Sequence, residues 1–314
     1  MLVQNIIFFI LSSLALIVSG VYLVKSLSKI SRFLGISEFS TAFIIMAFAT
    51  SIPELFVGVS SALSNNSALS LGNIIGANIL NLTLVAGIII ILGKEIKFKT
   101  KSIGKDTYLM LIAITLVIVL FVIGKSLSKI DGLILLGFFA FHVYNVFKKR
   151  KKYSKKLESD RHKKNRFLWL LIFMMSLVVL FVSSQYVVRY ASNIAVELNF
   201  PEIIVGLFLL SIATTLPELV FGVTAANTKH KEMAIGNTIG TTIVNSTFIL
   251  GIVAVINPIK ADFMPFLISG AFMFIAAFLL VTFIKSGRKL ERFEGISLIL
   301  LYVLFIIFEI FIKN

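Results

Sequence analysis

Apolar runs of about 17 to 25 residues recur along the whole of this 314-residue sequence, separated by short stretches rich in Lys and Arg. A run of that length, folded as an α-helix, matches the thickness of the hydrocarbon core of a bilayer. Hydrophobic residues make up 58% of the chain, more than a soluble domain of this size needs. The sequence therefore predicts an all-α protein that crosses a membrane ten times. The predicted segments are 4–24, 39–63, 68–92, 107–123, 132–147, 167–188, 202–226, 233–256, 263–284 and 296–312.

The basic residues between these segments predict the orientation of the chain. The stretch 148–166 alone holds eleven Lys or Arg. Cytoplasmic loops of membrane proteins are enriched in basic residues, and placing 148–166 in the cytoplasm puts 25 of the 30 Lys and Arg inside. We therefore expect a multi-pass protein of the cell membrane with both termini outside. The net charge of +15 then reflects topology and does not indicate nucleic acid binding.

The sequence repeats itself at an offset of 164 residues. "ATSIPELFVGV" at 49–59 matches "ATTLPELVFGV" at 213–223 at seven of eleven positions, and "GNIIGANILN" at 72–81 matches "GNTIGTTIVN" at 236–245 at six of ten. Each half contains five segments, an odd number, so the second copy should cross the membrane in the opposite sense. Inverted repeats are typical of secondary transporters, whose ion sites lie near the midplane where the repeats meet. The predicted divisions are a first five-helix repeat at 1–147, a basic linker at 148–166 and a second, inverted repeat at 167–314.

Two glutamates, Glu54 and Glu218, lie deep within apolar segments at equivalent positions of the repeat. A carboxylate near the bilayer centre is costly unless a partner compensates it, so it usually marks an ion pathway or site. A structural ion pair would need a buried base, and no Lys or Arg occurs inside any predicted segment. A mobile cation or a proton is then the expected partner of these carboxylates.

Each glutamate follows a proline, which removes a helix hydrogen bond and loosens carbonyls of the preceding turn. Free carbonyls at membrane depth are tolerated where they line a cavity or meet a ligand. A threonine four residues before each glutamate faces the same side of the helix. These hard oxygen donors suit Ca²⁺ or Na⁺ and do not suit soft transition metals. The candidate ligands of this motif are Glu54, Thr50 and Ser51 in the first half, and Glu218, Thr214 and Thr215 in the second.

The second motif adds amide oxygens at four-residue spacing, which places them on one helix face. Its glycines taken alone would also fit a helix-packing patch, and both interpretations stay open. Asn81 and Asn245 are the members that we expect to complete an oxygen cage opposite the glutamates. The residues on this face are Asn73, Ala77 and Asn81, and Asn237, Thr241 and Asn245.

Together, the two motif pairs resemble the paired alpha-repeats of the cation/Ca²⁺ exchanger superfamily, in particular its sodium/calcium exchanger branch. The resemblance covers the whole chain and is closest to a minimal prokaryotic member. It implies that Glu54 and Glu218 hold Ca²⁺ with the help of Thr50 and Thr214, and that segments one and six slide past the other eight. It implies a central site at Asn81 and Asn245, and flanking Na⁺ sites at the positions of Ala47, Ser51 and Ala77 and of Ser211, Thr215 and Thr241.

Two positions depart from patterns common in that superfamily. Position 77 is commonly serine, so Ala77 removes a hydroxyl from one expected Na⁺ site and leaves the Na⁺ stoichiometry and the choice of Na⁺ over H⁺ open. Asn245 stands where many prokaryotic and K⁺-dependent members have aspartate, so a K⁺ requirement is not expected.

The resulting hypothesis is a secondary active antiporter that exchanges Na⁺ for Ca²⁺ by alternating access. The alternative is antiport of H⁺ against Ca²⁺ or another divalent cation. A cation channel and a purely structural membrane protein are further possibilities; the inverted repeat argues against the first, and the two unpaired glutamates argue against the second. The chain lacks cysteine and any arrangement typical of an active site, so we expect no enzyme activity and no cofactor. The expected partners are Ca²⁺, Na⁺ or H⁺ and the lipid bilayer, with no nucleic acid and no obligate protein partner.

Overall fold

The computed structural model describes residues 2–33, 46–98, 101–150, 166–227, 231–287 and 289–311. Almost all of these residues are helical, in agreement with the predicted all-α class. In the first half the helices are α1 (Leu2–Phe33), α3 (Ala47–Thr50), α4 (Ile52–Leu63), α5 (Ser67–Leu80), α6 (Ala86–Gly93), α7 (Lys101–Gly124) and α8 (Lys129–Arg150). In the second half they are α9 (Arg166–Glu197), α10 (Glu202–Val205), α11 (Ser211–Ala226), α12 (Lys231–Ile243), α13 (Leu250–Ile256), α14 (Phe263–Gly287) and α15 (Arg292–Phe311). Three π-helical turns join adjacent helices: η2 (Asn81–Val85), η4 (Gly206–Leu210) and η5 (Val244–Ile249).

Seven helices of the described chain are long and apolar enough to cross a membrane, so this is a multi-pass membrane protein. Ile52–Leu63 is a shorter apolar helix, and the first part of the predicted segment 39–63 lies outside the described residues. The seven spans are Leu2–Leu23, Ser67–Gly93, Gly104–Gly124, Phe167–Glu197, Glu202–Ala226, Lys231–Ile256 and Phe263–Ser286.

Several helices run beyond the segments that hydropathy marks. The apolar segment 167–188 corresponds to α9, which continues to Glu197 and so includes Arg189. No Lys or Arg lies inside the predicted segment 167–188, but the helix continues past that segment, so the span Phe167–Glu197 does contain a basic residue. Arg189 is exposed, which explains how the helix tolerates it. Hydropathy detects only the part of a helix that is apolar, whereas the helix continues through polar residues at its ends.

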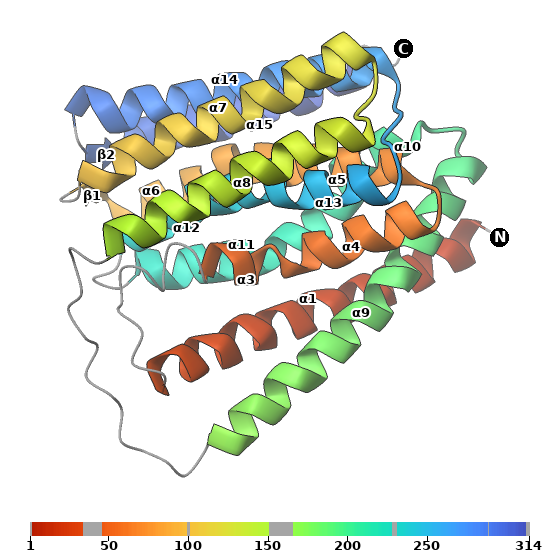
Figure 1. Ribbon diagram of the computed structural model, residues 1–314, viewed down its shortest axis with the longest axis horizontal. Helices are drawn as coiled ribbons and strands as arrows, with labels where there is room; N and C mark the ends of the chain where they lie inside the picture. Colours follow the sequence, from red (N-terminus) through yellow and green to blue (C-terminus); the bar gives the residue numbers. More distant parts are fainter. Residues whose placement is uncertain are drawn as a thin grey trace.

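The helices form a bundle with α1 and α9 on one side and α7, α14 and α15 on the other, as Figure 1 shows. The helices α4, α5, α11 and α12 lie between these two sides, and they contain the predicted motifs. Both chain termini lie at one end of the bundle, and the end of α8 and the start of α9 lie at the other (Figure 1). The helix α1 and its counterpart α9 run in opposite directions.

The buried apolar side chains form two separate clusters. The larger one joins the central and outer helices through residues such as Ile74, Ile89 and Phe121. The smaller one joins α1 and α9 to the motif helices through residues such as Leu16 and Val187. The pair α1 and α9 thus has its own packing interface, distinct from the core that holds the remaining helices together.

Glycines bring α5 into backbone contact with the start of the α10–η4–α11 segment. A Cβ atom on Gly72 would overlap the carbonyl oxygen of Ile203, and one on Gly206 would overlap the carbonyl oxygen of Leu69. Small residues allow such close approach of helices in membranes, where association depends on packing. Gly72, the first glycine of "GNIIG", therefore does serve helix packing, and that contact holds the polar residues beside it in place.

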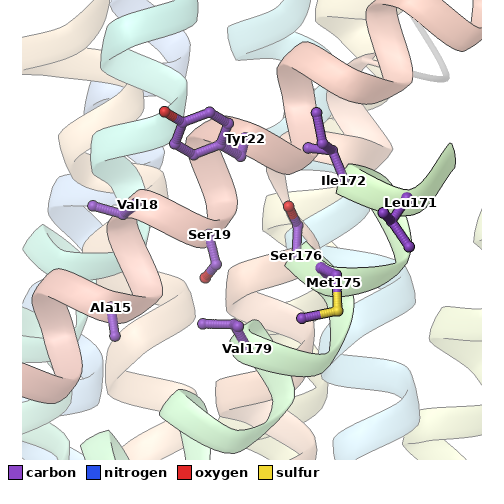
Figure 2. A pocket seen from close by; sticks show the side chains of 9 residues that line it. All are labelled: Ala15, Val18, Ser19, Tyr22, Leu171, Ile172, Met175, Ser176 and Val179. Atoms are coloured by element: carbon purple, nitrogen blue, oxygen red, sulfur yellow. The ribbon is translucent and has the colours of Figure 1, made fainter. Parts of the chain in front are cut away.

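A cavity of about 320 Å³ separates parts of α1 and α9 (Figure 2). Its walls are mostly apolar side chains, with Ser19, Tyr22 and Ser176 as the polar members. The side chains of Tyr22 and Met175, which line it, are about half exposed, so the cavity is open to the surface of the protein. The contact between α1 and α9 is thus incomplete over this stretch.

Candidate cation site

The two glutamates lie at the centre of the bundle. Glu54 and Glu218 are 0% and 2% exposed, although a lone buried carboxylate is strongly unfavourable. Among the described residues, none forms an ion pair with either glutamate, and none lies within hydrogen-bond geometry of their carboxylate oxygens. The two carboxylates are close enough to repel each other electrostatically. The structure thus brings together two negative charges that lie 164 residues apart in the sequence.

The two prolines act differently, which corrects the expectation that both loosen their helices in the same way. In the first half the helix is interrupted: α3 ends at Thr50, Ser51 forms a turn, and α4 begins at Ile52. Pro53 is then the second residue of α4, a position where helices do not use the backbone N–H. In the second half α11 continues through Pro217 without a break. The two halves therefore present their backbones differently around the glutamates.

The threonines and asparagines of the two motifs are paired across the halves. The Thr214 hydroxyl donates to Asn73 Oδ1 at 3.1 Å, and Asn237 Nδ2 donates to the Thr50 hydroxyl at 3.5 Å. Thr214 also lies near the Glu54 carboxylate, and Thr50 near that of Glu218, without forming a hydrogen bond to it. Each threonine thus belongs to the environment of the opposite glutamate. These contacts join α5 to α11 and α12 to α3.

Several oxygen atoms around the glutamates are buried and lack a hydrogen-bond partner among the described residues. Buried polar atoms are nearly always satisfied in folded proteins, so a group of such atoms in one place indicates a ligand site. Carboxylate, hydroxyl and amide oxygens are the ligands that Ca²⁺ and Na⁺ prefer. The oxygen atoms belong to Glu54, Glu218, Ser51, Thr215, Asn81, Asn237 and Asn245.

Two other positions expected to flank this site, Ser211 and Thr241, are also buried, but their hydroxyls have partners. The Thr241 hydroxyl donates to the carbonyl of Asn237 at 2.6 Å, and that of Ser211 donates to Phe208 at 3.4 Å. Each hydroxyl oxygen keeps lone pairs that can bind a cation. Ala47 and Ala77 are fully buried and have no side-chain oxygen. The first half therefore offers fewer side-chain ligands at these flanking positions than the second.

The central asparagines lie in π-helical turns that the sequence analysis did not predict. Asn81 begins η2, and Asn245 is the second residue of η5. In both turns a threonine hydroxyl donates to the carbonyl four residues earlier, from Thr83 to Ile79 and from Thr247 to Ile243. This bond competes with the backbone N–H for the same carbonyl and so favours a wider turn. The sequence signal that could have indicated these turns is the threonine that recurs two residues after each asparagine.

Because Cys is absent and His is rare, a transition-metal centre would be unexpected here, and the described residues contain no cluster of three or more His, Asp or Glu. The charge of the site comes from two carboxylates, and its other ligands are neutral oxygens. This donor set fits one Ca²⁺ or two monovalent cations as transported substrate.

Comparison with known proteins identifies the family. The model of the family described as "Sodium/calcium exchanger protein" matches residues 4–148 and 168–311 of this chain. The chain belongs to the sodium/calcium exchanger family. The sodium/calcium exchanger MaX1 of Methanosarcina acetivorans is 28% identical over 98% of this chain and 99% of its own length. The putative antiporter CaxA of Alkalimonas amylolytica is 30% identical over 96% of this chain and 97% of its own.

A solved structure of a sodium/calcium exchanger has the same fold. The exchanger NCX_Mj, soaked with Na⁺ and Sr²⁺, aligns with a TM-score of 0.70 at 25% identity, covering 98% of both chains. The match to a known exchanger therefore extends over nearly the whole chain, including both motif regions.

This exchanger-family chain contains buried polar residues that the sequence analysis missed. Asp106, near the start of α7, and Glu309, near the end of α15, are buried, and each has an interaction partner. Asn78 in α5 is fully buried and lies next to Ala77 in the motif. It accepts a hydrogen bond from Asn245, a candidate ligand. The four-residue spacing did not select Asn78 because it lies one position away from the predicted face.

Proposed function

We propose that this exchanger-family protein is a secondary active antiporter that exchanges Na⁺ for Ca²⁺ across the cell membrane by alternating access. The observation that supports it most directly is the pair Glu54 and Glu218, fully buried and within electrostatic range of each other. Buried hydroxyl and amide oxygens without partners among the described residues lie in the same helices and in elements that pack against them. The site has the charge and the ligand type of a cation-binding centre.

The charges of the site also provide a reason for obligatory exchange. One Ca²⁺ neutralises Glu54 and Glu218, and so do two Na⁺ or two protons. Moving a site with uncompensated charge past a low-dielectric barrier is costly, whereas a neutral, loaded site moves at a lower cost. The empty protein therefore reorients slowly, and each bound ion leaves when another replaces it.

The proposed architecture is ten membrane-spanning helices in two inverted repeats, 1–147 and 167–314, joined by the linker 148–166. Its support is a set of contacts between the halves that each occur twice. In the second occurrence, the equivalent helix of the other half makes the same contact. Two glycines contact each other's backbone between α6 and α15, and two others do so between α13 and α8. Two backbone pairings near helix ends show the same exchange. The glycine pairs are Gly87–Gly295 and Gly251–Gly132, and the backbone pairs are Ile96–Leu290 and Leu127–Ile259.

The moving part in this proposal is the pair α1 and α9. These helices meet the motif helices through the smaller hydrophobic cluster, separate from the larger core, and have an incomplete mutual contact at the cavity in Figure 2. Gly20 of α1 faces both motif prolines: a Cβ at this position would lie 2.9 Å from Pro217 Cγ and 3.3 Å from Pro53 Cγ. A smooth contact with no side chain at its centre is suited to a helix that slides over the site.

The proposed orientation has both termini outside the cell and the linker in the cytoplasm. Because the wild-type chain lacks cysteine, single cysteines report the sidedness directly. A thiol reagent that does not cross membranes should label Lys125→Cys, between α7 and α8, in intact cells. It should not label Lys97→Cys, an exposed position in β1 (Glu95–Lys97), until the cells are opened. The reverse pattern would contradict the orientation.

The decisive experiment for function is Ca²⁺ uptake into liposomes that contain the purified protein. Uptake is measured under an outward Na⁺ gradient and, in parallel, under an outward H⁺ gradient. We expect the Na⁺ gradient to drive uptake and the H⁺ gradient to have little effect. Uptake driven only by H⁺ would establish the alternative coupling ion, and the missing hydroxyl at Ala77 would then be part of the explanation. Uptake without any counter-ion gradient dependence would indicate a channel.

A further inference from the structure

Asn78 makes two directed hydrogen bonds that bear on a candidate ligand. Its Oδ1 accepts a bond of 3.2 Å from Asn245 Nδ2, and its Nδ2 donates a bond of 2.9 Å to the Ser246 hydroxyl. Its Nδ2 also lies 3.6 Å from the sulfur of Met273. These residues come from α5, η5 and α14, so the contacts are formed only in the folded bundle.

The orientation of the Asn78 amide is fixed by the chemistry of its neighbours. A thioether sulfur accepts hydrogen bonds but cannot donate them, so the side of the amide that faces Met273 must be the NH₂ group. The Asn78 oxygen then faces Asn245. Because that oxygen can only accept, Asn245 must present its own NH₂ group to it.

The consequence for Asn245 is that its oxygen is directed away from Asn78. This Oδ1 is fully buried and has no hydrogen-bond partner among the described residues. An amide binds a cation only through its oxygen, and its NH₂ group would repel the ion. The orientation that Asn78 imposes is therefore the one that can bind Ca²⁺ or Na⁺.

The equivalent asparagine of the first half has no such support. Neither amide atom of Asn81 has a hydrogen-bond partner in the described structure. The residue equivalent to Asn78 is Thr242, whose hydroxyl donates to its own helix at the Thr238 carbonyl. The residue equivalent to Ser246 is Leu82, which cannot accept a hydrogen bond. The two central ligands thus differ in how firmly they are oriented.

We infer that Asn78 is a positioning residue that orients the amide oxygen of Asn245 towards the transported cation, a role for which the described residues of the other half contain no equivalent. This inference rests on the proposed cation exchange. It assigns to Asn78 an effect on cation affinity that acts through Asn245 alone.

The test is a double-mutant cycle between Asn78→Leu and Asn245→Ala, with Thr242→Val as the matched control. The apparent Ca²⁺ affinity is measured in two ways: as the KM of Na⁺-driven uptake, and as the Ca²⁺ concentration that half-maximally raises the unfolding temperature in detergent. Loss of one net hydrogen bond should weaken apparent affinity by about three- to tenfold in Asn78→Leu. The same change in the Asn245→Ala background should have little further effect, and Thr242→Val should leave the affinity close to wild type.

Equal effects of Asn78→Leu in both backgrounds would overturn the inference, because they would show a structural role that is independent of Asn245. Unchanged affinity in Asn78→Leu would overturn it as well. Should Asn78→Leu fail to fold, Ser246→Ala is used instead, because it removes only the hydrogen bond that supports Asn78. We expect Ser246→Ala to lower the apparent Ca²⁺ affinity less than Asn78→Leu, and to have little effect in the Asn245→Ala background. If the wild-type protein shows neither uptake nor a Ca²⁺-dependent rise in unfolding temperature, the proposed function itself fails, and the inference fails with it.

Discussion

Replacing Glu54 by glutamine tests whether its carboxylate binds a cation or has a structural role. The change keeps the shape of the side chain and one amide oxygen, but removes one of two negative charges that have no basic partner among the described residues. At an effective dielectric constant of about 20, two unit charges about 4 Å apart attract by about 4 kcal/mol, so Ca²⁺, which carries two charges, attracts one carboxylate by about twice as much. Losing even half of that attraction, with the amide oxygen of glutamine kept as a ligand, weakens Ca²⁺ binding about a thousandfold. We therefore expect Ca²⁺ uptake to be abolished at micromolar Ca²⁺.

The same substitution should not destabilise the protein in the absence of Ca²⁺. Glu54 is 0% exposed and its carboxylate lies near that of Glu218, so glutamine removes a repulsion and a desolvated charge. If Glu54 belonged to a buried structural ion pair, breaking the pair would cost about 3–5 kcal/mol. The two interpretations thus predict opposite changes in the free energy of unfolding.

The assay is thermal unfolding of the purified protein with and without Ca²⁺, beside uptake into liposomes. A ligand present at about 100 times its dissociation constant stabilises the folded state by about 2.7 kcal/mol, and Glu54→Gln should lose this increment. Glu95→Gln, at an exposed carboxylate in β1, is the matched control and should keep it. Near-normal uptake in Glu54→Gln, or a marked loss of stability without Ca²⁺, would refute the assignment of Glu54 as a ligand.

Three further substitutions test separate parts of the structure. Ala77→Ser restores a hydroxyl at a buried position of the motif and should strengthen the competition of Na⁺ with Ca²⁺, measured as a lower inhibitory Na⁺ concentration; no change would show that position 77 binds no ion. Gly20→Leu places a side chain against Pro217, so the maximal exchange rate should fall at least tenfold while Ca²⁺-dependent stabilisation persists; an unchanged rate would argue against sliding of α1. Gly72→Ala would push a methyl group into the Ile203 carbonyl and should lower the unfolding temperature clearly below that of wild type, whereas Gly137→Ala, which meets open space, should not.

The helical membrane fold could be predicted from the sequence because its signal is local. A run of apolar residues spans a bilayer as a helix whatever surrounds it, since the lipid leaves the backbone no other partners. The ends of the helices were less well predicted, as α9 shows by continuing through Arg189 to Glu197. The break at Ser51 and the continuous helix at Pro217 were also not distinguishable, because the two motif sequences are nearly the same.

The types of residue in the candidate site could be predicted from the sequence, whereas the contacts between them could not. The repeat and the rarity of buried carboxylates pointed to Glu54 and Glu218, and the structure buries both at one place. The role of Asn78 was not predictable, because Asn78 lies one residue away from the face selected by the four-residue spacing. Its importance depends on Asn245, Ser246 and Met273, which are brought beside it only by folding.

The sequence by itself determined that this chain spans a membrane, that it contains two related halves, and that each half carries one carboxylate among oxygen donors. These properties follow from composition and repetition, which folding does not alter. The tertiary structure alone decided which groups meet: Thr214 with Asn73 and Thr50 with Asn237, pairs that lie 141 and 187 residues apart. It also gave Asn245 a hydrogen-bond partner in Asn78, whereas no described residue forms a hydrogen bond with the Asn81 amide. Such differences arise because the packing of α5 against the second half sets each side chain's neighbours, and no local pattern encodes that packing.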